Sequence, residues 1–436
     1  MTEKPESASV GTSITHSQNL WAIPDYRAWF AGDTSAKFAG SIRTFALPLA
    51  VVALTGSATQ AGLIATTSQA IGVICMVPGG VIVDRVDRRK IIFLFAAIGT
   101  AIWGTIAALF ATGHLTFQIL IALASLGAVN MGLFGFATDA VLRSIVRGES
   151  LVKAQAANRG RDASVELSAP PVGAALYSLG VWVPFAASVV GYLLLGLCGS
   201  LIARDLHPRI PTEITDEERH QGIFASAMTT FVTDLRQAWT WIRTHNLVLQ
   251  IIVPFAVINI GFMGAQFTYT YALVLQGRSP ESIAAYNMAI ALFALVGSAI
   301  ASRYSTRLAT GHTLTLGVPL AVCLLIPTII TFNYGVLIAA MGTCIFVRIV
   351  IEGHSAIVFS AAPQDIQGRL LSLLAVITSL PLACAPTISG WMLDYVGYRP
   401  AILLFVILGF IPALSWMAMP RVRSLPKPSQ WDTVEL

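Results

Sequence analysis

Seven ionisable side chains lie where this sequence is otherwise apolar, and their types decide what chemistry they could support. A charge that faces lipid costs roughly 2.5–3.5 kcal/mol on insertion scales, so we expect these residues to face a bundle interior, paired or hydrated. There a carboxylate can carry a proton, and an arginine can act as its counter-charge or bind an anionic group. The candidates for substrate binding or proton coupling are Asp33, Lys37, Arg43, Asp162, Glu166, Arg348 and Glu352.

Two pairs among these residues combine opposite charges at helical spacing. Asp33 and Lys37 are four residues apart, and so are Arg348 and Glu352. Residues at this spacing are neighbours on one helix face, so each pair can form a local ion pair. Such a pair either neutralises itself and is only structural, or takes part in function, and the sequence leaves both interpretations open.

Asp162 and Glu166 form a different kind of pair, because both residues are acidic at the same spacing. Two like charges this close oppose each other's ionisation, which is typical of a proton-binding site. A nearby cation would cancel this effect, and the candidates for that cation are Arg43, Arg159 and Arg161.

A second concentration of charge lies between Gly80 and Lys90, where it separates two long apolar runs. One interpretation is a turn at the cytoplasmic face of a membrane, because Arg and Lys outnumber Asp there. The other is a contact between helices. Gly80 lets a neighbouring helix come close, and Asp84, one turn later, can face that neighbour's positive N-terminal end.

The composition around these charges requires a membrane. Charged residues make up 11% of the 436-residue chain and hydrophobic residues 55%, whereas soluble domains are about 25% charged. An apolar stretch of about 20 residues can cross a bilayer as a helix. The sequence therefore predicts an all-α polytopic membrane protein with twelve transmembrane helices. The expected spans are 28–54, 60–83, 91–112, 116–137, 163–179, 183–203, 247–275, 282–302, 313–332, 334–360, 369–393 and 401–419.

Basic residues set the expected orientation. They gather in the tails and in the loops after even-numbered spans, whereas the opposite loops hold only Arg278 and Arg399. This bias predicts that both termini are cytoplasmic. In the long loop between the first six and the last six spans, apolar residues at steps of three and four over 224–242 predict an amphipathic helix. We expect this helix to lie on the inner leaflet rather than against a partner. The expected parts are a tail (1–27), a six-helix bundle (28–203), the cytoplasmic loop (204–246), a second bundle (247–420) and a tail (421–436).

The two groups of six spans resemble each other. Two glycines and a leucine within 173–180 recur at the same spacing within 390–397, and the charged turn at 84–89 recurs without its acid at 302–307. Such a repeat predicts two pseudo-symmetric bundles related by an axis along the membrane normal. Prolines free backbone carbonyls in a helix, so we expect Pro170-Pro171 to break the fifth span and Pro381 and Pro386 the eleventh.

Several functions are disfavoured by what the sequence lacks. It contains no G-x-x-x-x-G-K phosphate loop, which argues against an ATPase. All five cysteines lie inside apolar runs without metal-binding spacing, and no Asp-rich metal motif or Ser/His/Asp cluster suited to catalysis is evident. The net charge of +5 is accounted for by the basic loops. We therefore expect no cofactor, no metal, no nucleic-acid partner and no enzymatic activity.

The stretch from Gly80 to Lys90 resembles the signature of the major facilitator superfamily, Gly-x-x-x-Asp-Arg-x-Gly-Arg-Arg/Lys, with Asp87 in place of a glycine. Stretches 26–32, 45–57 and 367–372 resemble one bacterial branch of that superfamily, the exporters that include enterobactin and macrolide efflux proteins, and 168–173 resembles a degraded exporter signature. The resemblance implies a latch that holds the outward-facing state, in which Asp84 meets the N-terminus of the eleventh span and Arg88 meets Asp139. The latch candidates are Gly80, Asp84, Arg85, Arg88, Arg89 and Asp139.

These observations favour a secondary transporter that works by alternating access in the inner (cytoplasmic) membrane of a bacterium. We expect proton-coupled export of a small, moderately hydrophobic compound such as a drug or siderophore. The transporter would be a monomer embedded in the lipid bilayer, coupled to protons or to another ion. The alternative is an uncoupled facilitator, or a lipid or lysophospholipid flippase, of the same fold. An ion channel is disfavoured because no half-span filter loop is evident.

Overall fold

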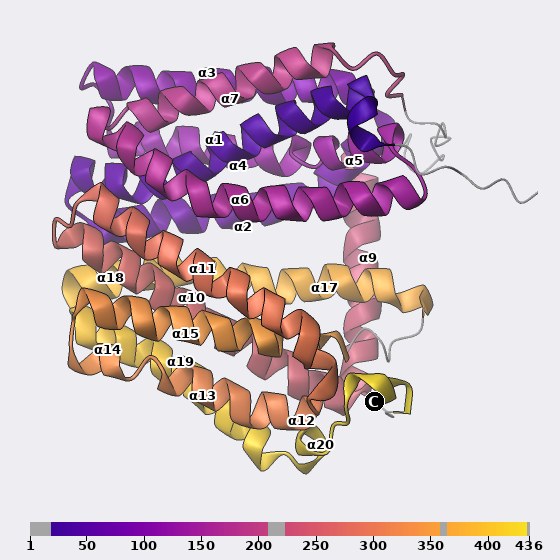
Figure 1. Cartoon of the computed structure of the whole chain (residues 1–436), viewed down its shortest axis with the longest axis vertical. Coiled ribbons are helices and arrows are strands. Elements are labelled where there is room, and N and C mark those ends of the chain that lie inside the picture. Colours follow the sequence, from indigo (N-terminus) through magenta and orange to yellow (C-terminus); the bar gives the residue numbers. More distant parts are fainter. Residues whose placement is uncertain (1–18, 208–222, 358–363, 434–436) are drawn as a thin grey trace, which may run out of the picture.

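The computed structural model describes residues 19–207, 223–357 and 364–433, and all regular elements in these ranges are helices. They form two bundles, one above the other in Figure 1, which confirms the predicted fold class. The first bundle contains η1 (Leu20–Ala22), α1 (Pro24–Thr55), α2 (Ala58–Arg85), α3 (Arg88–Ala111), α4 (Phe117–Phe134), α5 (Ala137–Ile145), α6 (Glu149–Leu179) and α7 (Val183–Ser200). The second contains α10 (Asn246–Leu275), α11 (Pro280–Tyr304), η2 (Ser305–Arg307), α12 (Thr310–His312), η3 (Thr313–Gly317), α13 (Val318–Cys323), α14 (Pro327–Ile330), α15 (Tyr334–Glu352), η4 (Gly353–Ala356), α17 (Gln364–Leu382), α18 (Ala385–Tyr395), α19 (Tyr398–Ala418), α20 (Pro420–Arg423) and η5 (Pro428–Thr433).

Eleven helical stretches of the described chain are long and apolar enough to cross a membrane. The remaining predicted span corresponds to α6, which begins at Glu149 rather than at residue 163. Arg161, Asp162 and Glu166 lie within α6 and make it less apolar than the others. The helix missing from the apolar set is therefore the one that carries the acidic pair.

Both bundles have tight turns at the same end. Gly56 and Gly277 follow α1 and α10 with φ of 69° and 67°, a left-handed conformation that glycine adopts at little steric cost. We call this the outer end. The opposite end, which α9 (Ile223–Thr244) crosses in Figure 1, is the inner end. These names follow the orientation predicted from the basic residues.

The two bundles contact each other directly at the outer end. There α2 packs against α18, and α6 packs against α11. A Cβ on Gly62 would lie 2.2 Å from the carbonyl oxygen of Pro386, and one on Gly390 would lie 2.2 Å from that of Ala58, so only glycine permits this approach. Two hydroxyls add hydrogen bonds across the interface, from Thr387 to Thr66 Oγ1 (2.7 Å) and from Ser178 to Glu281 Oε1 (2.6 Å).

Prolines interrupt two of the predicted spans. The expected break in the eleventh span is present, because α17 ends at Leu382 and α18 begins at Ala385. The ninth predicted span, 313–332, is also interrupted, and this break was not predicted from the sequence. It passes from a π-helix at Thr313–Gly317 into two short helices, which begin near Pro319 and Pro327. A proline has no backbone N–H to donate, so it interrupts the hydrogen-bond pattern of a helix.

The predicted break at Pro170-Pro171 is wrong, because α6 is continuous through both prolines. Packing against α1 and α11 holds the helix on two sides. Ala169 is fully buried, and a Cβ on Gly173 would lie 2.8 Å from Phe45 Cδ1. Neighbouring helices are one of the means by which a membrane helix accommodates proline without a break.

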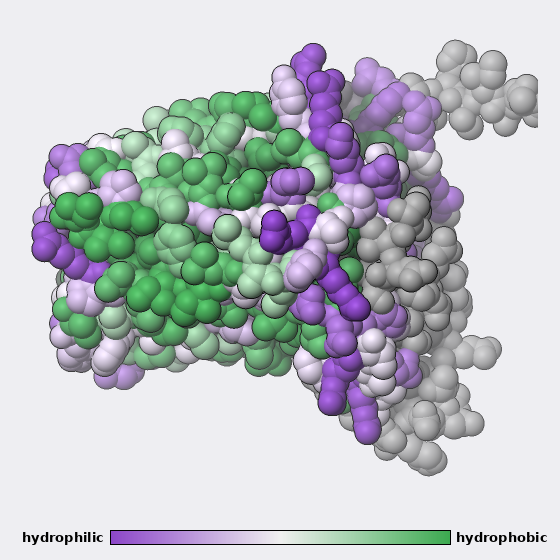
Figure 2. All heavy atoms as spheres, turned by 90° about the horizontal axis from the view of Figure 1, so that it is seen from below, coloured by the Kyte–Doolittle hydropathy of each residue, from purple (hydrophilic) through white to green (hydrophobic). Residues whose placement is uncertain are grey.

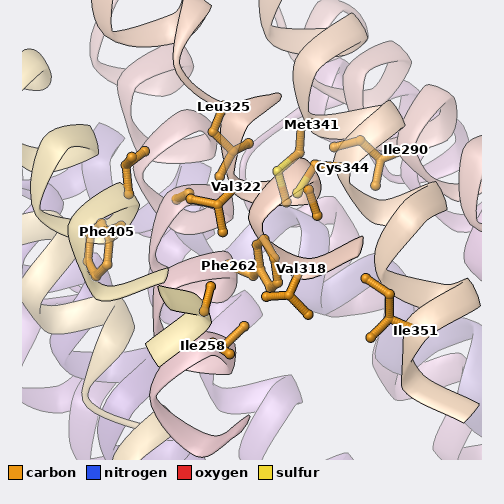
Figure 3. Close-up of a cluster of buried hydrophobic side chains, with 14 of the residues drawn as sticks. Ile258, Phe262, Ile290, Val318, Val322, Leu325, Met341, Cys344, Ile351 and Phe405 are labelled. Atoms are coloured by element: carbon orange, nitrogen blue, oxygen red, sulfur yellow. The ribbon is translucent and has the colours of Figure 1, made fainter. Parts of the chain in front are cut away.

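Most buried apolar residues gather in one cluster per bundle, and Phe45, Ala46, Leu49 and Ala174 of the first bundle pack into the cluster of the second. Figure 3 shows part of the second, where Phe262 of α10, Val318 and Val322 of α13, Met341 of α15 and Phe405 of α19 come together. All five are almost fully buried. Because close-packed cores resist deformation, we expect each bundle to move largely as a unit.

The helix predicted in the long loop is present as α9. In Figure 1 it runs across the ends of the other helices, and it contacts α2 of the first bundle and both α10 and α17 of the second. Ala238 and Ile242 are buried in the core of the second bundle, whereas Val232 and Trp239 are exposed. Its apolar face is therefore divided between protein contacts and exposed surface.

Candidate functional site

The central cavity has two adjoining parts. The first, of about 450 Å³, lies inside the first bundle and is lined mainly by α1 and α6. The second, of about 500 Å³, lies between the bundles and is lined by α1, α6, α10, α11 and Ile345 of α15. Ser41, Thr44 and Glu166 line both parts. Each part falls within the size range of small-molecule sites, roughly 300–1,000 Å³.

Four charged residues form a cluster at the inner side of the first part. We call Asp33, Lys37, Arg161 and Asp162 the charge cluster. Arg161 Nη1 lies 2.7 Å from Asp33 Oδ2, and Arg161 Nη2 lies 2.8 Å from Asp162 Oδ1. Lys37 Nζ lies 3.5 Å from Asp33 and 3.6 Å from Asp162. Two acids and two bases therefore neutralise one another.

The buried half of this cluster is held by aromatic residues. The side chains of Asp33 and Arg161 are 3% and 5% exposed. The Arg161 guanidinium lies 5.3 Å from the ring centre of Phe30 and 5.9 Å from that of Trp29. Trp29 is fixed in turn by its Nε1, which donates to the carbonyl of Thr138 at 2.7 Å. Buried charges require such pairing, so Asp33 and Arg161 depend on each other.

The pairing changes the interpretation of Asp162 and Glu166. Arg161 was one of the cations that could neutralise the acidic pair, and it contacts Asp162 through both Nε (3.0 Å) and Nη2 (2.8 Å). Asp162 therefore belongs to the neutral cluster. Glu166, one turn further along α6, lines both parts of the cavity.

Glu166 and Arg43 are the charges of the central cavity that have no oppositely charged partner within ion-pair distance among the described residues. Arg43 packs instead on the Trp103 ring, with its guanidinium carbon 4.1 Å from the ring centre. This cation–π contact orients the arginine without neutralising it. Within the described part of the chain, the cavity thus presents one carboxylate and one guanidinium without an ion-pair partner.

The second part of the cavity is mostly apolar, with a few amides and hydroxyls. Gln266, Thr270 and Asn287 provide hydrogen-bonding groups between the bundles. The rest of the lining is largely aliphatic and aromatic, and includes Phe45, Pro48, Met263, Phe267, Tyr271, Ile283, Ile290 and Ile345. Such a lining favours a moderately hydrophobic ligand that can accept or donate a few hydrogen bonds.

Arg348 and Glu352 lie away from this cavity. They form the ion pair expected from their spacing, with Arg348 Nη2 3.6 Å from Glu352 Oε2. Both line a separate narrow crevice within the second bundle, beside Phe255 and Trp416. The structure therefore brings together five of the seven candidates and separates these two from them.

The turn between α2 and α3 lies at the inner end, with Asp84 exposed and Arg85 partly exposed. Gly80 faces open space. The close approach is at Gly79 instead, where a Cβ would lie 2.3 Å from the carbonyl oxygen of Gly132. Asp139, also exposed, lies on α5 at the same end. The latch between Asp84 and the eleventh span belongs to the outward-facing state and stays a prediction.

Three residues of this turn have clear contacts. Arg88 Nη1 donates to Ser144 Oγ at 2.7 Å, rather than to Asp139. Arg89 donates to the carbonyls of Ile202 and Arg204, just beyond the end of α7. Asp87, which departs from the family signature, caps α3 by accepting the N–H of Arg89 at 2.9 Å. This capping accounts for an acid at a position where the signature has glycine.

Sequence reasoning missed Asp394, which closes the outer end. This residue lies in the last turn of α18, and its carboxylate receives hydrogen bonds from the first turn of α2. The donors are Ser57 Oγ (2.7 Å), Ala58 N (3.1 Å), Thr59 N (2.8 Å) and Thr59 Oγ1 (2.7 Å). A carboxylate from one bundle thus caps the positive helix end of the other. The sequence did offer a signal for this residue. Asp394 is an acid at the end of the eleventh predicted span, within the stretch 390–397 that matches 173–180.

Comparisons with known proteins agree with this architecture. The family model described as the Major Facilitator Superfamily matches residues 34–355. No curated protein matches the chain. The fold resembles a bacterial homologue of the iron transporter ferroportin in an inward-facing state (TM-score 0.66, 15% identity, covering 92% of this chain and 100% of that one). It also resembles a bacterial homologue of the human lysosomal transporter Spinster, inward-facing and unoccupied (0.67, 14%, 91% and 97%), and the peptide transporter POT in complex with sulfate (0.65, 14%, 94% and 97%).

Proposed function

This chain belongs to the Major Facilitator Superfamily, and we propose that it is a proton-coupled exporter that works by alternating access. We place it in the inner membrane of a bacterium, as a monomer with both termini in the cytoplasm. The observation that carries the proposal is that Glu166 and Arg43 line one cavity without an ion-pair partner among the described residues. Unpaired charge at mid-depth in a membrane protein is costly, and such residues typically belong to ion or substrate pathways.

The conformation fits an inward-facing transporter. The bundles are hydrogen-bonded to each other at the outer end, through Asp394 and the hydroxyls of Thr387 and Ser178. Towards the inner side of the cavity, the side chains of Lys37 and Asp162 are 39% and 44% exposed. A cavity sealed on one side and hydrated on the other is one of the two end states that alternating access requires.

Glu166 is the residue that we propose to carry the proton. In the outward-facing state, a proton from outside would neutralise Glu166 and remove its attraction for Arg43. The two bundles would then rock, and the inward-facing cavity would release the proton to the cytoplasm. After the proton has left, substrate from the cytoplasm would bind in the cavity. It would be released outside when the bundles return to the outward-facing state. Because Arg43 packs on Trp103 and has no carboxylate partner among the described residues, it is available to bind an anionic or carbonyl group of the substrate.

The second part of the cavity defines the substrate class that we propose. Its lining combines apolar side chains with Gln266, Thr270 and Asn287. A drug-like or siderophore-like molecule, small and moderately hydrophobic with a few carbonyl or hydroxyl groups, suits such a lining. A fully apolar molecule would leave these amides and hydroxyls unpaired, which carries a free-energy cost.

Transport by purified protein in liposomes tests the role of Glu166. A compound is first selected as the one that most raises the melting temperature of the detergent-purified protein in a screen of antibiotics, siderophores, peptides and lipids. Uptake of that compound is then measured with and without an imposed pH gradient. We expect Glu166→Gln to abolish gradient-driven accumulation but to retain exchange of the compound at equal pH.

Glu352→Gln is the matched control, because it removes a carboxylate that lies outside the cavity. It should leave coupling intact. If Glu166→Gln accumulates the compound as the wild type does, Glu166 is not the proton carrier. If flux through the wild type ignores the gradient, the protein is an uncoupled facilitator or a flippase instead.

A further inference from the structure

A third cavity lies at the inner end of the second bundle, apart from the central one. It has a volume of about 650 Å³. None of its lining residues lines the central cavity. It is bounded by η3, the end of α19 and the short helix α20, and its lining residues are His312, Thr315, Leu316, Met417, Pro420, Arg423 and Ser424.

The chain after α19 folds back to build this cavity. The backbone N–H groups of Thr310 and Gly311 donate to the carbonyls of Pro426 and Leu425, each at 3.1 Å. Trp431 Nε1 donates to Thr310 Oγ1 at 2.9 Å and ties the returning segment down. A Cβ on Gly311 would lie 2.2 Å from the carbonyl oxygen of Arg423, so a glycine is needed for this close return. The backbone at Arg423 is thereby held at the rim.

The polar side of the cavity is cationic. Arg423 is exposed and lines the cavity together with His312 and Ser424, and none of the lining residues that the structure describes is acidic. Within the described chain, neither Arg423 nor His312 has a carboxylate within ion-pair distance. An arginine without a carboxylate partner can bind a phosphate through two hydrogen bonds.

The opposite side of the cavity is apolar and exposed on the surface of the bundle. Leu316 is 59% exposed and Met417 is 40% exposed, although both belong to apolar spans. Figure 2 views the molecule from below, onto the second bundle, and shows a broad hydrophobic surface ending at a hydrophilic band towards one end. The cavity lies where the span Thr310–Ile330 begins and the span Tyr398–Ala418 ends, so it offers a place for a charged headgroup beside an acyl chain.

We propose that this cavity binds an anionic phospholipid of the inner leaflet, with Arg423 and His312 on the phosphate and Leu316 and Met417 along an acyl chain. The proposal is independent of the transport mechanism. A soluble phosphate compound would use Arg423 equally well but would gain nothing from the exposed Leu316. The apolar wall therefore favours a lipid.

Native mass spectrometry of the detergent-purified full chain tests the proposal, with phosphatidylglycerol as the probe and phosphatidylcholine as its zwitterionic counterpart. Arg423→Gln should weaken phosphatidylglycerol binding about tenfold, because it removes charge-assisted hydrogen bonds. Arg421→Gln is the matched control. It removes the same charge from an exposed residue of the same helix that does not line the cavity, and it should bind phosphatidylglycerol like the wild type.

Leu316→Ala tests the acyl contact separately and should weaken phosphatidylglycerol binding without creating affinity for glycerol phosphate. Leu320→Ala, at a residue that is 54% exposed but does not line the cavity, should have no effect. Equal losses for Arg423→Gln and Arg421→Gln would show general surface attraction and overturn the proposal. So would unchanged binding in both Arg423→Gln and Leu316→Ala, or glycerol phosphate competing as well as the lipid.

Discussion

Asp394 offers a direct test of what holds the outer end closed. Its carboxylate accepts four hydrogen bonds from the first turn of α2, two from backbone N–H groups and two from hydroxyls. These bonds cross from the second bundle to the first, so they exist only while the outer end is closed. Asp394→Asn keeps the shape of the side chain but removes its charge and replaces one acceptor oxygen by an NH₂ group.

The expected loss follows from these contacts. A hydrogen bond to a charged group contributes roughly 1.5–3 kcal/mol when buried, and a charge at a helix end roughly 0.3–1 kcal/mol. Asp394 is exposed, which reduces both contributions, and asparagine retains one acceptor. We therefore expect the closed state to lose about 1–2 kcal/mol. That free energy corresponds to about a 5- to 30-fold shift towards the open outer end.

Distances between spin labels across the outer end report this shift. Labels at His114→Cys and Ile330→Cys, both exposed, would follow the separation of the two bundles in a background without the five native cysteines. Asp394→Asn should add or enlarge a long-distance component. Asp205→Asn serves as the control, because Asp205 is fully exposed and hydrogen-bonds to His207, which lowers its pKa, far from the outer contact. An unchanged distance distribution for Asp394→Asn, or the same shift for Asp205→Asn, would refute the reasoning.

Three further substitutions test other contacts. Arg161→Gln leaves the buried Asp33 without its closest cation and should destabilise the protein by about 3–5 kcal/mol, seen as a lower melting temperature in detergent. Gly62→Ala places a Cβ where only 2.2 Å separates it from the Pro386 carbonyl oxygen, so spin-label distances should show an outer end that cannot close fully. Asp84→Asn should impair transport while the protein still inserts into the membrane, and normal transport would reduce the signature turn to a topology signal.

The fold could be predicted from the sequence because uninterrupted apolar runs of about 20 residues match helices that cross a bilayer. What the apolar pattern could not show is how a helix tolerates proline. Pro170 and Pro171 leave α6 continuous, whereas the eleventh span is interrupted between Leu382 and Ala385, beside Pro381 and Pro386. The position of a proline in the sequence therefore does not show by itself whether the helix breaks there.

The site was partly predictable for a similar reason. The cost of intramembrane charge identified Arg43 and Glu166, and both line the central cavity. Arg161, on the same helix as Asp162, was one of three candidate cations. Spacing along one helix cannot reveal partners on another, so Lys37 of α1 was not predicted as the second cation beside Asp162. Asp394 was missed because its partners lie on α2, more than three hundred residues earlier in the chain.

The contacts that close the outer and the inner end are related, and this relation leads to a final prediction. At the outer end, the acid at the end of α18 caps the start of α2. In the latch that the family resemblance implies at the inner end, Asp84 at the end of α2 would cap the start of α17. The same pair of spans would then hold each end state through a carboxylate at a helix N-terminus, with the roles of the two spans exchanged.

If so, Asp394→Asn and Asp84→Asn weaken opposite states, and their effects on the equilibrium should have opposite signs. The two sites lie at opposite ends of α2, so their free energies should add. The double variant should therefore return the spin-label distances towards those of the wild type, even though each single variant departs from it. A double variant that resembles Asp394→Asn alone would show that Asp84 does not stabilise the outward-facing state.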